Sequence, residues 1–280
     1  MTTRGGVDQS ETDIRNAAFW NELCGSGLAR SIGITDRTPE SLRKFDEAYM
    51  AMYPYLSGYV TAESLTGKRT LEIGLGYGTL GQLIALRGCQ YHGLDIAAGP
   101  VEMMRYRLAL LGKAAEERVQ KGSALDIPYP DGTFDYVYSI GCLHHTGDLA
   151  KGVSEVYRVL AAGGTAVVML YNRHSFRQLA QLRTRYVWEI LTGRRRGSFG
   201  EAVRARYDSN VTGDAAPHTD FVSRSDVRRY LFRRFSSVRI DVQNFDGYVL
   251  FRGRIVIPRE KLLGNVARIL GTDLYIVATK

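Results

Sequence analysis

The sequence predicts an α/β protein built on a mostly parallel sheet, and three observations lead to this prediction. Short apolar segments alternate with helical patterns from residue 69 to residue 171, as they do in right-handed βαβ units. A glycine-rich turn follows the first apolar segment, where a strand leads into a helix. The chain has 280 residues, which is enough for one large α/β domain with insertions.

The strands and helices are expected in regular order up to residue 171, after which the alternation breaks. We expect strands at 69–73, 90–94, 117–120, 134–139, 165–171, 237–245 and 273–279. We expect helices at 13–29, 39–60, 78–88, 99–111, 148–160, 174–192, 198–207 and 224–235. Thr38 and Pro39 are typical of a helix start, with a capping side chain followed by proline at the first position.

This pattern divides the chain into a short leader, a cap and a main domain. The expected divisions are a disordered lead-in at 1–12, an N-terminal helical cap at 13–66, and a domain at 67–280 with a substrate-side insertion at 172–223. The insertion follows a strand of the sheet, so we expect it to lie over the carboxyl ends of the strands, where ligands bind in open α/β sheets.

Composition and charge set limits on location and partners. The three cysteines are far apart and form neither a metal-binding spacing nor a disulfide framework. The sequence contains no apolar run of membrane-spanning length and no apolar signal segment at its start, so we expect a cytoplasmic protein. The net charge of +8 divides into −4 for residues 1–150 and +12 for residues 151–280. The basic half indicates an anionic substrate, RNA or anionic lipid, or simply a solvated arginine-rich surface.

The glycine-rich turn is the strongest local signal for a bound nucleotide-like cofactor. It reads Glu72-Ile73-Gly74-Leu75-Gly76-Tyr77-Gly78. Glycines allow the backbone to approach a ligand closely and to adopt turns that other residues avoid. A strand-to-helix turn of this kind therefore predicts a cofactor site.

Two cofactors compete for this turn. Gly76, Gly78 and Gly81 satisfy the dinucleotide fingerprint, with Asp95 at the end of the next predicted strand. Glu72, however, lies directly before the turn, where its carboxylate would repel a pyrophosphate. S-adenosylmethionine has no phosphate and carries two cationic groups, so the acidic residue favours this methyl donor over NAD. Asp95 suits the ribose hydroxyls of either cofactor, or it merely caps the helix that follows.

Three further segments resemble class I, Rossmann-like S-adenosylmethionine-dependent methyltransferases, especially the ubiquinone/menaquinone-biosynthesis group. They are residues 122–135, residues 139–148, and the run from Glu155 through Arg158 to Gly164. With the glycine-rich turn they make four motifs in the order and spacing of that family. The resemblance covers residues 67–171 strongly and the two closing strands weakly.

The resemblance implies a seven-stranded Rossmann-like methyltransferase sheet, mostly parallel with the last strand antiparallel, and with helices on both faces. It also implies S-adenosyl-L-methionine as the cofactor. The residues that it assigns to cofactor binding are Glu72, Gly74, Gly76, Tyr77, Gly78, Asp95, Ile96, Ser123, Ala124, Leu125, Ser139, Ile140 and Gly141. Many relatives have Asp at the position of Ser123, so this sequence departs from the family there.

Histidines are the candidate catalytic residues. His144 and His145 follow the fourth predicted strand, where donor and acceptor are expected to meet, and His218 lies in the predicted insertion. An unperturbed imidazole titrates near neutral pH and suits proton removal from the acceptor. The alternative for the pair is a structural role in hydrogen bonding to loop backbone.

The acceptor is expected between the cap and the insertion. The candidate substrate contacts are Phe19, Trp20, Tyr171, His174 and His218. Aromatic residues at helical spacing also occur in ordinary cores, and the segment around His218 also reads as a surface loop. The predicted function is methyl transfer to a small molecule by in-line displacement, with the accepting atom (oxygen, nitrogen or carbon) and the oligomeric state left open.

Three rival functions stay open. The basic half fits an RNA-modifying methyltransferase, but the sequence shows neither an RNP-type module nor an Asn-Pro-Pro-Tyr signature. The dinucleotide fingerprint fits an NAD-dependent oxidoreductase, but a Tyr-x-x-x-Lys pair is missing. A scaffold that binds the cofactor without turnover is the third.

Overall fold

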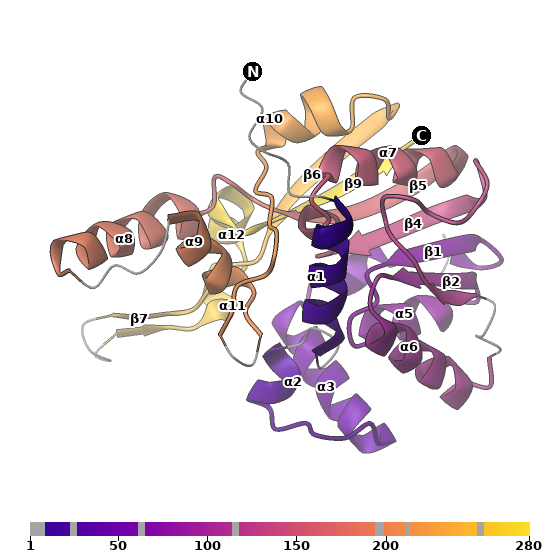
Figure 1. Ribbon diagram of the computed structural model, residues 1–280, viewed down its shortest axis with the longest axis horizontal. Helices are drawn as coiled ribbons and strands as arrows, with labels where there is room; N and C mark the ends of the chain where they lie inside the picture. The colour runs from indigo at the N-terminus through magenta and orange to yellow at the C-terminus, as the bar shows by residue number, and fades with distance from the viewer. Residues whose placement is uncertain are drawn as a thin grey trace.

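The computed structural model describes residues 9–22, 27–60, 65–113, 118–193, 199–210, 213–250 and 255–280. Its centre is a seven-stranded sheet in the order β3-β2-β1-β4-β5-β9-β6 (Figure 1). The strands are β1 Arg69–Ile73, β2 Gln90–Asp95, β3 Val119–Lys121, β4 Phe134–Ile140, β5 Leu160–Tyr171, β6 Ser237–Gln243 and β9 Asp273–Thr279. β9 runs antiparallel to β5 and to β6, and the other pairings are parallel. The predicted fold class is therefore confirmed, including the antiparallel last strand.

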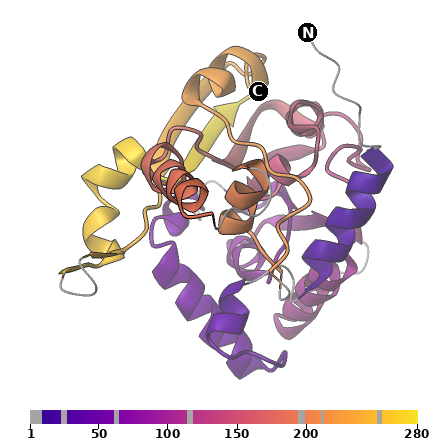
Figure 2. The same ribbon diagram turned by 60° about the vertical axis from the view of Figure 1, so that its left-hand side comes forward.

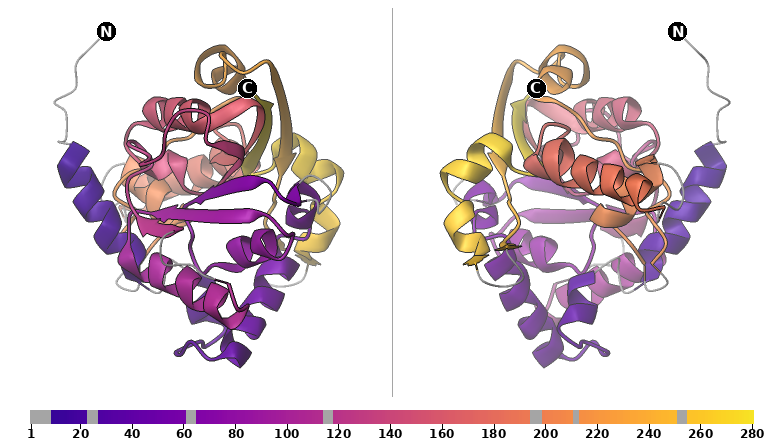
Figure 3. Two further views of the ribbon diagram at one scale, coloured as in Figure 1. Left: turned by 90° about the vertical axis from the view of Figure 1, so that its right-hand side faces the viewer. Right: turned by 90° about the vertical axis from the view of Figure 1, so that its left-hand side faces the viewer.

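Helices cover both faces of this sheet (Figure 3). The helices between strands are α5 Thr79–Ala85, α6 Ala98–Leu110 and α7 Leu149–Val159. Side chains of α5 and α6 pack with Tyr138 and Tyr275 in one buried cluster, and those of α7 pack with Val137 and Ile276 in another. Burial on both faces explains why the strands read as nearly continuous apolar runs.

The N-terminal cap consists of α1 Gln9–Asn21, α2 Gly27–Ser31, α3 Pro39–Met52 and the short helix η2 Leu56–Tyr59. α1 begins at Gln9, so residues 9–12 of the predicted disordered lead-in are helical, whereas residues 1–8 lie outside the described residues. Thr38 caps α3 as predicted, because its hydroxyl accepts a hydrogen bond from the Ser41 amide. α3 ends at Met52, eight residues before the predicted end, because Pro54 disfavours a helical conformation at Tyr53.

A buried ion pair fastens this cap to the main domain. Arg107 of α6 is fully buried and donates to both carboxylate oxygens of Asp46 on α3, at 2.8 and 2.9 Å. Its Nε atom donates to the carbonyl of Tyr77 in the glycine-rich turn, and Nη1 donates to the side chain of Gln82 on α5. Asp46 also accepts from the hydroxyl of Thr79. One guanidinium therefore joins the cap, the turn and two helices.

The segment after β5 differs most from the prediction. The expected helix at 174–192 is a π-helical turn, η4 Arg177–Gln181, followed by α8 Leu182–Leu191. The expected helix at 198–207 is α9 Phe199–Tyr207, and that at 224–235 is α10 Arg224–Asp226 continued by the π-helical turn η5 Val227–Leu231. The hairpin β7 Tyr248–Leu250 and β8 Ile255–Ile257, and helices α11 Arg259–Leu262 and α12 Asn265–Leu270, were not predicted. In the part of the chain described here, no helix is both long and apolar enough to cross a bilayer.

Candidate functional site

A pocket opens at the carboxyl ends of β1, β2 and β4, and residues of α1 help to line it. Figure 1 shows α1 next to these ends of the sheet. It encloses about 820 Å³ of empty space, counted out to its open mouth. Its lining residues are Asp13, Asn16, Trp20, Ile73, Gly74, Gly76, Leu94, Asp95, Ile96, Pro100, Gly122, Ser123, Ala124, Ile140, Gly141, Cys142, His145 and Thr146. The position agrees with the rule that ligands of open α/β sheets bind beyond the carboxyl ends of the strands.

Two glycines shape the wall of the pocket. Gly74 has a φ of 83° and Gly76 a φ of 50°, both in the left-handed region that favours glycine. A Cβ atom on Gly74 would lie 2.8 Å from the Cys142 sulfur, so the turn and the loop after β4 approach as closely as glycine allows. A Cβ atom on Gly76 would meet nothing within 4 Å. Gly76 therefore keeps space free at the pocket wall for a ligand.

Asp95 ends β2 with its carboxylate at the pocket. One oxygen accepts from the Leu75 amide of the glycine-rich turn at 2.8 Å, and the other accepts from the Ala97 amide at 2.9 Å. The side chain is nearly buried, and this desolvation raises the pKa of Asp95 to about 6 against the opposing effect of the amide hydrogen bonds. The amides of Gly76 and Ile96 act on the same carboxylate, which lines the pocket at the point where a ligand hydroxyl can donate to it.

Glu72, by contrast, is not among the residues that line the pocket. Its carboxylate lies behind the turn, where the hydroxyl of Tyr91 donates to it and where a Cβ atom on Gly81 would collide with it. Burial raises the pKa of Glu72 to about 8. Tyr77 and Gly78 also lie outside the lining of the pocket. The Tyr77 ring stacks on Phe45 of the cap at 4.1 Å, and a Cβ atom on Gly78 would meet the side chain of Arg107.

The buried Glu72 predicts a specific pH dependence of stability. Its pKa is raised above the unfolded value of about 4.5, so the folded state holds a proton that the unfolded state releases between pH 4.5 and 8. The stability due to this proton is present below pH 4.5 and is lost as pH rises towards 8. Glu72→Gln, which is neutral throughout, should gain about 1.4 kcal/mol per pH unit relative to wild type over this range.

Urea unfolding at pH 5, 6, 7 and 8 measures this difference. Glu102→Gln is the control, because Glu102 is largely exposed in a distant ion pair with Arg37. If the free energies of unfolding of wild type and Glu72→Gln change with pH in the same way, Glu72 is ionised in the folded protein.

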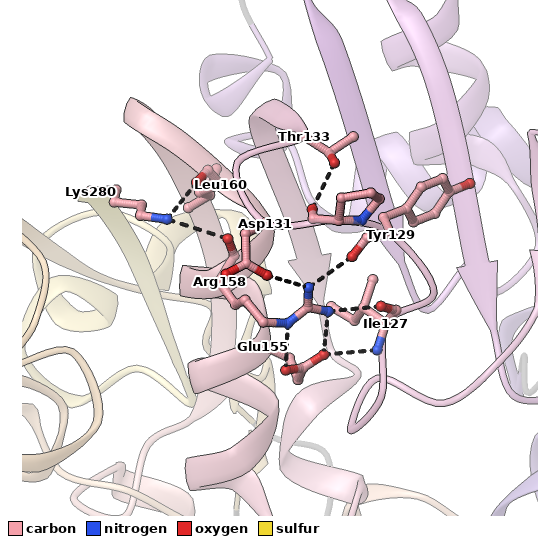
Figure 4. Close-up of polar contacts among 9 residues, drawn as sticks. Ile127, Tyr129, Asp131, Thr133, Glu155, Arg158, Leu160 and Lys280 are labelled. Atoms are coloured by element: carbon pink, nitrogen blue, oxygen red, sulfur yellow. Dashed lines mark hydrogen bonds and ion pairs between the residues drawn. The ribbon is translucent and has the colours of Figure 1, made fainter.

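The loop after β3 brings Ser123, Ala124 and the neighbouring Gly122 to the pocket, whereas Leu125 lies outside its lining. Figure 4 shows the polar contacts by which α7 holds the next part of this loop, around Ile127 and Tyr129. Arg158 donates to both oxygens of Glu155 and to the carbonyls of Ile127 and Tyr129. Glu155 in turn accepts from the Ile127 amide. The Glu155–Arg158 motif thus contributes to the site by positioning this loop.

The loop after β4 supplies the opposite wall. Ile140 and Gly141, which the resemblance assigned to cofactor binding, line the pocket, and Ser139 lies fully buried behind them. Cys142 and Thr146 also line it and were not predicted. Burial raises the pKa of the Cys142 thiol, so this group is a small neutral wall residue and not a thiolate.

α1 covers the pocket with one face. Asp13, Asn16 and Trp20 line it, and their spacing of three and four residues places them on the same side of the helix. The amide of Asn16 donates to the carbonyl of His145 at 2.8 Å, which ties α1 to the loop after β4. Only Trp20 was predicted, although the same helical spacing would have indicated Asp13 and Asn16 as well.

His145 lines the pocket, while His144 is fully buried outside its lining. His145 donates from Nδ1 to the carbonyl of His218 at 2.8 Å, and its ring lies 4.8 Å from that of Trp20. Its Nε2 atom is buried 3.6 Å from the carboxylate of Asp208. Burial lowers the pKa of both histidines, that of His144 most strongly, so both are neutral at pH 7.

The other predicted substrate contacts do not line the pocket. Tyr171 is enclosed by aromatic rings and donates to Asp208 at 3.0 Å, and Phe19 packs edge-on against Trp20. His174 is exposed, and the side chain of His218 pairs with Asp220 at 3.1 Å. The carbonyl of His218, rather than its imidazole, reaches the site through His145.

The charge of the pocket is opposite to that of the protein. The lining contains the carboxylates of Asp13 and Asp95 and, among the described residues, no lysine or arginine, although the net charge of the chain is +8. Such a wall attracts cations and repels anions. It suits a sulfonium and an ammonium group and is unsuited to a pyrophosphate.

Comparison with known proteins agrees with this geometry. Residues 71–168 match the sequence profile of a family described as "Methyltransferase domain". The chain is 34% identical over 103 residues to ajmaline N-methyltransferase of Rauvolfia serpentina, covering 36% of this chain and 35% of that protein. It is 31% identical over 111 residues to a ubiquinone biosynthesis O-methyltransferase of Pseudomonas putida, covering 40% and 47%. The chain thus matches less than half the length of these relatives.

The fold has solved counterparts. A chain from the complex between the Haloferax volcanii Trm112 methyltransferase activator and a methyltransferase superposes with a TM-score of 0.55 at 15% identity, over 87% of this chain and 95% of that one. A likeness at this identity supports the fold alone. The strand order, the glycine-rich turn and the matched profile together identify the family of the matched part: residues 71–168 belong to a class I S-adenosylmethionine-dependent methyltransferase domain.

Proposed function

We propose that this chain transfers the methyl group of S-adenosylmethionine to an amine nitrogen of a small molecule. The observation that carries the proposal is the lining of the pocket, with two carboxylates and no lysine or arginine among the described residues. Asp95, the glycine-rich turn and the Ser123 loop fit the methyl donor, because they offer acceptors, free space at Gly76 and no cation. The donor supplies an electrophilic methyl group bonded to a positively charged sulfur.

We assign the methyl acceptor to the part of the pocket that α1 and the loop after β4 line, with Asp13, Asn16, Trp20, His145 and Thr146. An aromatic face and a carboxylate together favour an amine over a carboxylate or a phosphate. Asp13 is placed to accept a hydrogen bond from the amine and to take its proton on methylation. The basic C-terminal half led us to consider an anionic acceptor. Among the described residues, however, no lysine or arginine lines the pocket to pair with an anion.

Transfer of labelled methyl groups to a panel of acceptors tests the proposal. The panel contains primary and secondary amines, phenols, carboxylates and total transfer RNA. We expect label in amines. Label confined to phenols would favour O-methylation, as the name of the Pseudomonas putida relative describes for that protein. Label in RNA alone would replace the proposal by an RNA-modifying function.

Asp13→Asn is expected to lower kcat/KM for the amine about a hundredfold or more, because it removes a charge-assisted hydrogen bond that contributes about 1.5–3 kcal/mol together with the acceptor of the proton. The dissociation constant of S-adenosylmethionine should stay within about threefold of wild type. Glu11→Gln is the control, because Glu11 is exposed on the same helix outside the pocket lining. Equal kcat/KM values for wild type and Asp13→Asn would remove Asp13 from the acceptor site.

His145 is proposed as a positioning residue that joins α1, the loop after β4 and the His218 segment. Its Nε2 atom is buried against Asp208 and has no hydrogen-bond partner among the described residues. His145→Asn places an amide where Nδ1 donates to the His218 carbonyl, so we expect kcat to stay within about tenfold of wild type. A general base contributes about 10²–10⁴-fold. A loss of that size, with the disappearance of an ionisation below pH 6.5 from the kcat/KM profile, would instead make His145 the base.

A further inference from the structure

α8 turns its apolar side towards solvent. The exposed residues are Val187, Trp188, Ile190 and Leu191, and Leu191 is 79% exposed. Val187 and Leu191 are one helical turn apart, and Trp188 and Ile190 flank them. Leu182, on the other side of the helix, is buried. Figure 1 shows α8 projecting from the body of the protein beside α9, away from the central sheet, and in Figure 2 the same helix comes towards the viewer. A surface helix that packs only on its own protein shows the reverse arrangement.

Basic residues accompany this apolar face. Arg183 is exposed on α8 itself, and Arg206 is exposed on α9. In the sequence, residues 182–197 contain five arginines and one acidic residue, Glu189. The right-hand panel of Figure 3 looks onto this side of the molecule, where α8 and α9 lie in front of the sheet. An exposed apolar face with a tryptophan and surrounding arginines is the arrangement of helices that lie in a membrane interface.

We propose that α8 docks this protein on an anionic membrane surface. Val187, Ile190 and Leu191 enter the boundary between headgroups and acyl chains, Trp188 lies at the headgroup level, and Arg183 faces lipid phosphates. The strongly basic C-terminal half, with a charge of +12 over residues 151–280, adds long-range attraction to the same surface. The proposal is independent of the methyl acceptor.

Charge favours a membrane over the other possible occupants of this face. In a symmetric dimer the same patch meets itself, so the arginines of one copy would face those of the other. Nucleic acid contacts arginines through phosphates but gives no burial to four adjacent apolar side chains. An anionic bilayer satisfies both the charge and the apolar face.

Flotation of the full chain with lipid vesicles tests the proposal. We expect binding to vesicles of phosphatidylcholine with one quarter phosphatidylglycerol, weaker binding to pure phosphatidylcholine, and loss of the difference in 0.5 M salt. Val187→Ser with Leu191→Ser should weaken partitioning at least tenfold. Arg183→Glu should weaken binding to anionic vesicles and leave binding to neutral vesicles unchanged.

The controls are matched in chemistry. Leu86→Ser with Leu110→Ser removes two exposed leucines outside α8, and Arg43→Glu reverses an exposed charge on α3. Neither should alter partitioning. The chain has two tryptophans, so Trp20→Phe leaves Trp188 as the sole emitter, and its emission should shift to shorter wavelength on anionic vesicles.

Three results would overturn the proposal. The first is wild-type protein that does not float with anionic vesicles. The second is floating that Val187→Ser with Leu191→Ser leaves intact, which would place membrane contact elsewhere. The third is a concentration-dependent dimer in sedimentation that the same double variant abolishes, without vesicle binding, which would make this face a contact between copies of the chain.

Discussion

Replacement of Arg107 by methionine is expected to lower the free energy of unfolding by about 3–5 kcal/mol. The guanidinium is fully buried and makes four hydrogen bonds, two of them to Asp46. Methionine fills a similar volume but leaves the Tyr77 carbonyl without this donor and leaves Asp46 without its cation, with the hydroxyl of Thr79 still donating to it. Because Tyr77 belongs to the glycine-rich turn, the affinity for S-adenosylmethionine should fall as well.

Urea unfolding compares this variant with Arg37→Met. Arg37 is exposed and forms a 3.8 Å ion pair with Glu102, so its loss should cost less than about 1 kcal/mol. Equal effects of the two substitutions would mean that the cap is not fastened to the domain through Arg107.

Asp95→Asn is expected to weaken S-adenosylmethionine binding about a hundredfold or more. The carboxylate accepts from the amides of Leu75 and Ala97 with separate oxygens. An asparagine has one acceptor oxygen, so its NH₂ group would face one of these amides, donor against donor. The turn then loses its fixed position, and the ligand loses a charged acceptor worth about 1.5–3 kcal/mol.

Asp126→Asn is the control for this variant, because Asp126 is an exposed carboxylate outside the lining of the pocket. Circular dichroism and urea unfolding establish that both variants are folded. Binding by folded Asp95→Asn within threefold of wild type would show that Asp95 does not hold the ligand.

The central fold was predictable because its signals are local. The strand at 69–73 and the glycine-rich turn are read from adjacent residues, and the structure has β1 at Arg69–Ile73. Thr38 and Pro39 likewise indicate the start of α3, because the capping side chain and the proline both act within the first turn of the helix. These features depend on neighbours in sequence, so a single sequence is enough to predict them.

Features that depend on distant contacts were missed. α1 begins early at Gln9, whose amide donates to the Thr146 carbonyl as well as to Asp13. Arg107 and Asp46 are 61 residues apart, and no local pattern pairs them. The short elements β7, β8, α11 and α12 carry too few residues for a periodic signal.

The residues assigned to the site from the sequence agree with the lining of the pocket where backbone geometry decides, and less well where the direction of a side chain decides. Gly74, Gly76, Asp95 and Ile96 line the pocket because they end strands or form the turn. Glu72 directly precedes Ile73, which lines the pocket. Because side chains alternate along a strand, the side chain of Glu72 points to the other face of the sheet. The acceptor end depends on how α1 lies across the domain, so Asp13 and Asn16 emerged only from the structure.

Calorimetric titration of the purified chain with S-adenosylmethionine, and in parallel with NADH, measures which cofactor the pocket binds. We expect saturable, micromolar binding of S-adenosylmethionine with one site per chain, and no binding of NADH. Binding of NADH without S-adenosylmethionine would contradict it, because the acidic pocket would then hold a pyrophosphate beside Asp95.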